Sequence, residues 1–179
     1  LAHHEFERAL QVSPTLWYLF ELRAWFEEGE MVFGSAANVT ASKAKQSSVM
    51  SNKMRAHSAY FAFRRGNTVP AYDALTLIMQ HLPSGENTHA QLYLGIVSRE
   101  MGKLAEANEV LRACLEKAKE NGDKWTQSMS GQFLGIIALD AGEYDAAHRY
   151  LTEALAVARE MGDPMLTAHA LSFLSLTIQ

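Results

Sequence analysis

The chain has 179 residues, of which 48% are hydrophobic and 20% charged, with only 4 prolines; this composition excludes disordered, collagen-like and coiled-coil chains. Lysine and arginine number 16 against 20 aspartate and glutamate, and a net charge of −4 argues against a general nucleic-acid binder. No apolar run approaches the roughly 18 residues of a membrane span, and the single cysteine, Cys114, cannot form an internal disulfide, which favours a cytoplasmic location.

The N-terminal part of the chain predicts helices in an irregular repeat pattern. Residues 1–14 have the pattern of the tail of one repeat, and residues 15–50 that of an irregular second repeat. Within the latter, residues 17–28 predict a first helix that Gly29 ends, because glycine adopts the left-handed conformation of a helix stop without strain. The small, polar stretch 34–48 predicts either a helix packed closely against its neighbours or a mobile segment.

The repeat becomes regular in the rest of the chain. Residues 51–84 predict a helix that ends at Gly66, followed by a second helix. Residues 87–123 and 124–163 then align at an offset of 40 residues. The pairs that carry this alignment include Leu94 with Leu134, Gly95 with Gly135, Gly102 with Gly142, Ala107 with Ala147, Leu111 with Leu151 and Leu115 with Leu155.

Each regular repeat predicts two helices. In residues 87–123, Gly102 ends the first helix and Gly122 ends the second. Asp123 is then a good N-cap for the next helix. Gly95 and Gly135 are small residues at positions where paired helices cross, so each pair is expected to form a tight antiparallel hairpin.

The end of the chain predicts one more helix. Gly162, Asp163 and Pro164 repeat the stop-and-cap pattern before residues 164–179, which predict the first helix of a further repeat. We therefore expect the sequence to be a fragment of a larger protein; the alternative is that this helix is a natural solvating helix that ends the array. Because one hairpin cannot cover its own apolar face, the hairpins must stack, and the predicted fold is an all-α solenoid of antiparallel helix hairpins.

The spacing of small and large residues in these hairpins resembles the tetratricopeptide repeat (TPR). The residues that carry the resemblance are Gly135, Gly142, Tyr144, Ala147, Leu151 and Ala154, and they recur one repeat earlier as Gly95, Gly102, Leu104, Ala107, Leu111 and Cys114. The resemblance implies a right-handed superhelix. Gln91 and Gly131 occupy the position where the family carries tryptophan, and this departure, with the long period, is similar to the long-helix variant of MalT-like, LuxR-type and antibiotic-regulator proteins that are linked to ATPases.

If the hairpins stack in this way, their first helices line a concave groove. We expect this groove to bind a protein, a peptide or a small anionic effector. Its predicted lining residues are Lys53, His57, Tyr60, Phe63, Arg64, His89, Leu92, Ile96, Arg99, Met129, Gln132 and Ile136. The alternative is that Leu92, Ile96 and Ile136 pack against neighbouring helices in a tightly wound superhelix.

Charge is distributed unevenly along the chain. No aspartate or glutamate lies between Met31 and Tyr72, while six basic residues do. We call these six the basic segment: Lys43, Lys45, Lys53, Arg55, Arg64 and Arg65. The segment predicts an anionic partner or the acidic end of a second copy, and its alternative is an ordinary solvated face. We expect no direct nucleic-acid contact, because no known reading motif is present.

The inventory of chemically reactive patterns is poor. The histidines are scattered, and no phosphate-binding glycine loop, nucleophile elbow or metal-ligand spacing is present. The predicted function is that of a non-enzymatic, cofactor-free domain that binds a protein or an effector. By the resemblance, it is the sensor or interaction part of a bacterial transcriptional or signalling regulator; the alternative is a passive scaffold or self-association module.

Overall fold

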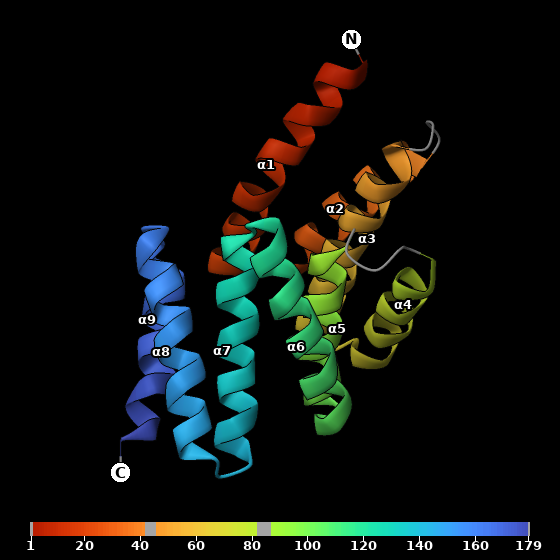
Figure 1. The fold of residues 1–179 in the computed structure, drawn as a ribbon. Helices are drawn as coiled ribbons and strands as arrows, with labels where there is room; N and C mark the ends of the chain where they lie inside the picture. The colour runs from red at the N-terminus through yellow and green to blue at the C-terminus, as the bar shows by residue number, and fades with distance from the viewer. Residues whose placement is uncertain (1, 42–45, 82–86, 179) are drawn as a thin grey trace. The chain divides into compact units, whose positions relative to one another are not determined.

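The computed structural model describes residues 2–41, 46–81 and 87–178, and these ranges form helices joined by short turns, without a strand (Figure 1). The helices are α1 Ala2–Arg23, α2 Phe26–Ala41, α3 Gln46–Arg64, α4 Thr68–His81, α5 Thr88–Glu100, α6 Leu104–Asn121, α7 Lys124–Asp140, α8 Tyr144–Glu160 and α9 Pro164–Leu174, with a 3-10 turn at Ser175–Thr177. None of them, over the described ranges, is long and apolar enough to cross a membrane. The chain divides into two compact units, Leu1–Ala90 (unit 1) and Gln91–Gln179 (unit 2).

The predicted glycine stops lie at helix ends. Gly66, Gly102, Gly122, Gly142 and Gly162 all have φ between +66° and +92° and follow α3, α5, α6, α7 and α8. At each of these positions a side chain would be strained, so glycine ends the helix at low cost. The spacing of these residues therefore predicted the helix ends of the regular repeats correctly.

The predicted caps at the start of α7 and α9 are confirmed. The Asp123 carboxylate accepts a hydrogen bond from the Thr126 amide at 3.1 Å. The Asp163 carboxylate accepts from the amides of Met165 and Leu166, each at 3.0 Å. Pro164 occupies the first turn of α9, where its missing amide proton costs nothing.

The N-terminal prediction is wrong in its helix boundaries. Helix α1 continues through residue 14 to Arg23, and the turn that follows is made by Ala24, whose φ is +54°. Gly29 does not end a helix but lies inside α2, where a Cβ would come within 2.8 Å of the Phe61 ring. The glycine is there for close packing rather than for a turn. In the stretch 34–48, residues 34–41 belong to α2 and 46–48 to α3, and residues 42–45 lie outside the described part.

The core of unit 1 is aromatic. Phe61 of α3 is fully buried and lies at the centre of a cluster of rings from α1, α2 and α3. Its ring neighbours, with centroid separations of 5.5–6.4 Å, are Trp17, Phe20, Phe26, Phe33 and Tyr60. This cluster holds the first three helices together around one side chain.

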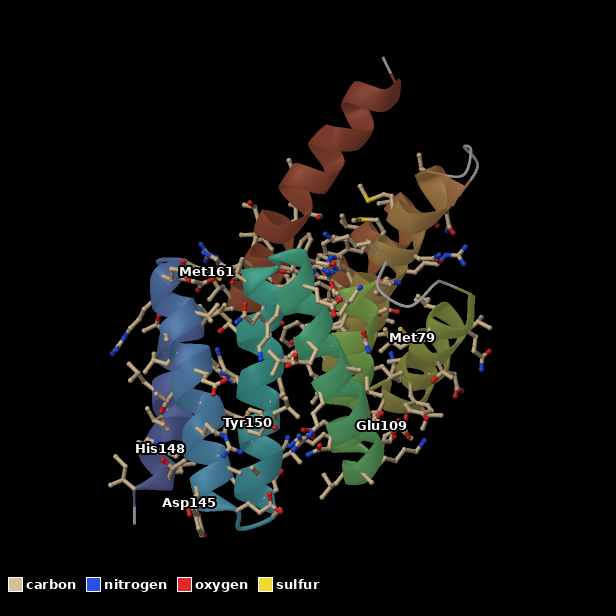
Figure 2. The ribbon with its side chains drawn as sticks, in the orientation of Figure 1. Met79, Glu109, Asp145, His148, Tyr150 and Met161 are labelled. Carbon is tan, nitrogen blue, oxygen red and sulfur yellow. The ribbon has the colours of Figure 1, made fainter. Side chains whose placement is uncertain are left out.

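Unit 2 is held by tight helix crossings. A Cβ on Gly95 would lie 2.5 Å from Leu111 Cγ, and a Cβ on Gly135 would lie 2.5 Å from Leu151 Cγ. Leu111 and Leu151 are fully buried, so in each hairpin a leucine from the second helix packs against the bare backbone of the first. The outer side of α8 carries exposed polar residues such as Asp145 and His148 (Figure 2).

Candidate functional site

The structure buries most of the residues that were predicted to line a groove. His57, Tyr60, Leu92, Ile96, Met129, Gln132 and Ile136 are at most 6% exposed. Lys53, Phe63, Arg64, His89 and Arg99 are partly exposed. Leu92, Ile96 and Ile136 are buried. Their burial agrees with the alternative interpretation, in which these residues pack against neighbouring helices. A groove lined by the remaining residues stays a prediction.

Gln132 is a buried connector within unit 2. Its Nε2 donates hydrogen bonds to Ser128 Oγ at 3.1 Å and to the Leu166 carbonyl at 3.2 Å, and its Oε1 is paired with His169 Nδ1. Ser128 Oγ donates in turn to the Ala154 carbonyl at 3.1 Å. The network joins α7 to both α8 and α9, so Gln132 is a structural residue rather than a surface for a ligand.

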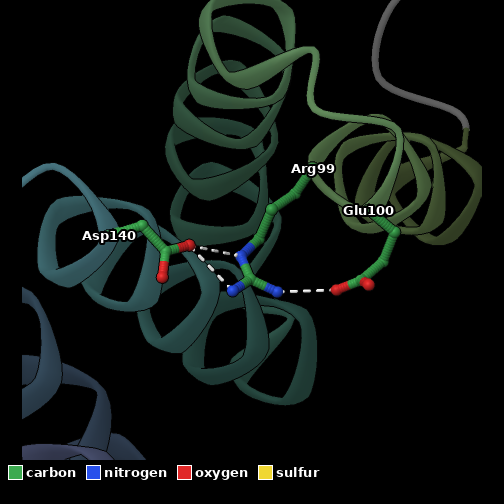
Figure 3. A network of polar contacts seen from close by, with 3 residues as sticks. All are labelled: Arg99, Glu100 and Asp140. Atoms are coloured by element: carbon green, nitrogen blue, oxygen red, sulfur yellow. Dashed lines mark hydrogen bonds and ion pairs between the residues drawn. The ribbon is translucent and has the colours of Figure 1, made fainter.

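Arg99 is also engaged within unit 2. Its guanidinium donates to one carboxylate oxygen of Asp140, from Nε at 2.9 Å and from Nη2 at 2.7 Å (Figure 3). The remaining Nη1 donates to Glu100 at 2.6 Å. The residue thus ties the end of α5 to the end of α7, and its charge is already matched by two carboxylates.

Two residues of the basic segment, Arg64 and Arg65, are paired with acidic residues that precede the segment in the chain. Arg64 pairs with Glu21 and also lies over the Phe26 ring at 4.5 Å. Arg65 pairs with Glu30 at 2.7 Å and approaches Glu27 at 3.8 Å. These acidic partners precede Met31, so the count of charges between Met31 and Tyr72 did not include them. They come close to Arg64 and Arg65 only once the helices have packed.

Two of the remaining basic residues, Lys43 and Lys45, lie outside the described residues. Lys53 lies close enough to His57 and His89 to lower the pKa of both. Arg55 is exposed and makes no ion pair with any residue in the described ranges. Of the basic segment, Arg55 is therefore the cation best placed to meet an external carboxylate.

His57 and His89 lie together although they are far apart in the sequence. Their ring centroids are 5.3 Å apart, and the His57 ring also packs against Phe33 at 4.8 Å. Burial, with help from Lys53, lowers the pKa of His89 to about 3. Burial, then His89 and Lys53, hold the pKa of His57 well below its ordinary 6.5. Both rings are thus neutral at pH 7.

We expect acidification from pH 7 to pH 5 to destabilise unit 1. The folded pKa values lie below those of the unfolded chain, so below about pH 6.5 the unfolded state binds protons that the folded state does not. Each neutral histidine then costs up to about 1.4 kcal/mol per pH unit until its folded pKa is reached. Denaturant unfolding at the two pH values measures this slope. His57→Leu should reduce it, and an unchanged slope in His57→Leu contradicts the assignment.

A cleft of about 300 Å³ opens on unit 1 between α2, α3 and α4. Its floor is made of small and apolar side chains, and Glu30, Arg55 and Ser58 supply the polar part. The complete lining is Glu30, Arg55, Ser58, Ala59, Ala62, Pro70, Ala71, Ala74, Leu77 and Ile78. Leu77 is 55% exposed. We call this the α3–α4 cleft; of its lining residues, only Arg55 is among the predicted site residues.

The described residues hold no group of three or more histidine, cysteine, aspartate or glutamate side chains that could bind a metal ion. Cys114 is buried, and burial raises the pKa of its thiol to about 12. A thiol held in this way is a poor nucleophile.

The TPR-like fold recurs in solved structures. BtubC (BKLC) from P. vanneervenii has a TM-score of 0.73 at 16% identity, covering 99% of this chain and 76% of that one. The nearly identical TPR-like repeats of a protein described as a kinesin light chain from Podosopora anserina have a TM-score of 0.63 at 14% identity, covering 94% and 84%. A point variant of the same protein has a TM-score of 0.64. At these identities the likeness shows the fold.

Sequence comparison gives the family. Curated protein sequences give no match. The family model described as anaphase-promoting complex subunit 5 matches twice, over residues 60–134 and 129–178. The two matches overlap at residues 129–134, as expected where successive helix hairpins repeat one pattern, and together they extend over about two thirds of the chain. The chain, a TPR-like array of helix hairpins, therefore belongs to the anaphase-promoting complex subunit 5 family.

Proposed function

We propose that the chain is a non-enzymatic protein-binding module that holds a partner protein within a larger assembly. The observation that carries the proposal is the family match over residues 60–178, because the family is named for a subunit of a complex. The TPR-like fold supports it, since folds of this kind generally mediate protein interactions and are generally non-enzymatic. The open α3–α4 cleft supplies exposed apolar surface for such a contact.

Gel filtration of a clarified extract of the source cells tests this proposal, with the protein that carries this chain detected by antibody. We expect the protein in the extract to elute at a much larger apparent molecular mass than the purified protein, because it is bound to partners. Chemical cross-linking followed by mass spectrometry should then place cross-links from unit 1 or unit 2 to another protein. Elution at the size of the purified protein, without cross-links to another chain, contradicts the proposal.

The same column with light scattering tests self-association, the alternative role. The purified chain is run at low and high salt beside a variant in which Lys43, Lys45, Lys53 and Arg55 are reversed in charge. A dimer that is lost in salt and in the variant would make assembly the leading function. A monomer of 19.9 kDa under every condition leaves the partner protein as the explanation.

Three finer predictions are proposals of the same kind: a sensor role in a bacterial transcriptional or signalling regulator, a small anionic effector, and a cytoplasmic location. The effector would have to compete with carboxylates already bound, since Arg64 and Arg99 are paired. A DNA-binding or nucleotide-binding segment in the same protein would support the regulator role.

A further inference from the structure

Corresponding helix hairpins in the two units differ in the volume of the space between their helices. The repeat pattern aligns Gly66 with Gly142 and Leu75 with Leu151 in the sequence. Helices α3 and α4 of unit 1 therefore correspond to α7 and α8 of unit 2. In unit 1 the groove is the α3–α4 cleft of about 300 Å³. In unit 2 the pocket that shares four of the aligned lining positions, Gly131, Tyr150, Glu153 and Ala154, has a volume of only about 10 Å³. A difference on this scale between equivalent grooves needs a cause in the side chains.

Two substitutions between the repeats explain the difference. Arg55 stands where unit 2 has Gly131, at which a Cβ would lie only 3.2 Å from the Cβ of Ala154 in α8. Ala74 stands where unit 2 has Tyr150, whose side chain lies at the closed groove (Figure 2). The first substitution replaces a close backbone approach with a long side chain, and the second removes the tyrosine ring that lines the unit 2 pocket.

The mouth of the groove also changes in character. Leu77, which is 55% exposed, aligns with the exposed Glu153 of unit 2. Leu77 and the alanine-lined floor together present apolar surface at the mouth of the α3–α4 cleft. The unit 2 groove has a charged residue at the same place and a floor that is already filled.

The charged side chains around the α3–α4 cleft indicate which charge a bound partner would carry there. The Glu30 carboxylate is held by Arg65 at 2.7 Å. Arg55 is the lining residue whose charge no ion pair among the described residues offsets. An occupant that buries this mouth must therefore supply a carboxylate to Arg55.

The dimensions of the cleft suit a helix. Its lining spans residues 55–62 of α3 and 70–78 of α4, which is about two turns or 10–12 Å of helix. A docked helix presents apolar side chains over that length at positions i, i+4 and i+7. Tyr150 in unit 2 shows that a large side chain fits between helices of this repeat at the position of Ala74.

We propose that the α3–α4 cleft binds an amphipathic helix of a partner protein, with an apolar anchor over Ala74 and a carboxylate paired to Arg55. The inference rests on the proposed function, because it names the site and the chemistry of the partner that this function requires.

The probe is a displayed library of amphipathic helical peptides about 16 residues long, selected on the whole chain. We expect selected peptides to carry an i, i+4, i+7 apolar pattern with a glutamate or aspartate beside it. A fluorescein-labelled selected peptide is then titrated with each variant by fluorescence anisotropy.

The variants are chosen by comparing aligned positions of the two repeats. Ala74→Tyr introduces the residue that fills the groove in unit 2, and we expect it to weaken binding of the peptide about tenfold or more. Leu77→Glu and Arg55→Glu should each weaken binding several-fold, and Arg55→Glu should bind better to a peptide whose acidic residue is changed to lysine. Ala113→Tyr is the matched control, since it adds the same ring at an exposed position of α6 and should leave binding unchanged.

Circular dichroism confirms that each variant is folded, and Leu77→Glu keeps the test decisive if Ala74→Tyr does not fold. A peptide whose affinity is equal in all variants overturns the cleft assignment but leaves the proposed function standing. A library that yields no binder overturns the cleft, while the extract experiment decides the function separately. A dimer of the purified chain that Ala74→Tyr dissociates shows a second copy as the occupant and overturns the assignment to a partner protein.

Discussion

Gly135→Val is expected to destabilise unit 2 by about 1–3 kcal/mol, the usual cost of forcing extra carbon atoms into a packed interface. A Cβ at this position would lie 2.5 Å from Leu151 Cγ and 2.9 Å from Leu151 Cδ2. Valine is a better helix former than glycine by a few tenths of a kcal/mol. The overlap with Leu151 outweighs that gain, because the leucine is fully buried and cannot move aside. Denaturant unfolding followed by Trp125 fluorescence measures the effect.

A second substitution separates overpacking from a local helix effect. Leu151→Ala alone should cost about 2–5 kcal/mol through the cavity it leaves. The double variant Gly135→Val with Leu151→Ala restores the number of side-chain carbon atoms at the crossing. It should be more stable than the sum of the two single effects by at least about 1 kcal/mol. Additive effects would mean that the two residues do not share the contact.

Position matters for this effect, so the same substitution elsewhere is a control. Gly34 lies inside α2, and a Cβ there meets only Ser58 Oγ within 4 Å, at 3.2 Å. Gly34→Val is expected to cost less than about 1 kcal/mol. An equal loss at both glycines would contradict a specific role for the crossing of α7 and α8.

Phe61→Ala is expected to cost about 3–5 kcal/mol, as is usual when a buried phenylalanine is truncated. The ring is fully buried and touches rings from α1 and α2 as well as from its own helix. Its removal leaves a cavity at the point where the three helices meet. Trp17, whose ring centroid is 6.4 Å away, reports the loss by fluorescence during denaturant unfolding.

Phe63 on the same helix provides the comparison. It is only half-buried and touches Tyr60 at a centroid separation of 6.2 Å. Phe63→Ala should therefore cost clearly less than Phe61→Ala. Phe61→Leu should recover a large part of the loss, because leucine keeps most of the apolar volume. If Phe61→Ala and Phe63→Ala cost the same, the central role of the aromatic cluster is contradicted.

The regular part of the fold could be predicted from sequence because its signals are local. Gly102, Gly122 and Gly162 occupy left-handed positions that other residues adopt only with strain, and Asp123 and Asp163 cap the helices directly after them. At the first turn of the chain the same rule gave the wrong residue. Ala24 adopts the positive φ there, although alanine carries no such signal.

The site could be predicted less well because it depends on contacts between distant residues. Nothing in the local sequence brings Glu21 to Arg64 or His57 to His89, since these pairs form only after the helices pack. The cleft had a signal that could have been found. Aligning Ala74 with Tyr150 shows a small residue where a later repeat has a ring, and a volume lost at an inter-helix position is a hole unless something else fills it.

The buried amide of Gln132 has a consequence for how far the array can be shortened. Repeat proteins are often treated as modular, so that a terminal helix can be trimmed without harm to the next repeat. Here α9 supplies the Leu166 carbonyl and the His169 ring that satisfy Gln132. Cleavage after Asp163 would remove two of the hydrogen-bond partners of Gln132 and uncover apolar side chains of the α7–α8 hairpin. The α7–α8 hairpin is therefore expected to lose stability when α9 is cut away, and a protease that removes α9 should go on to degrade the hairpin.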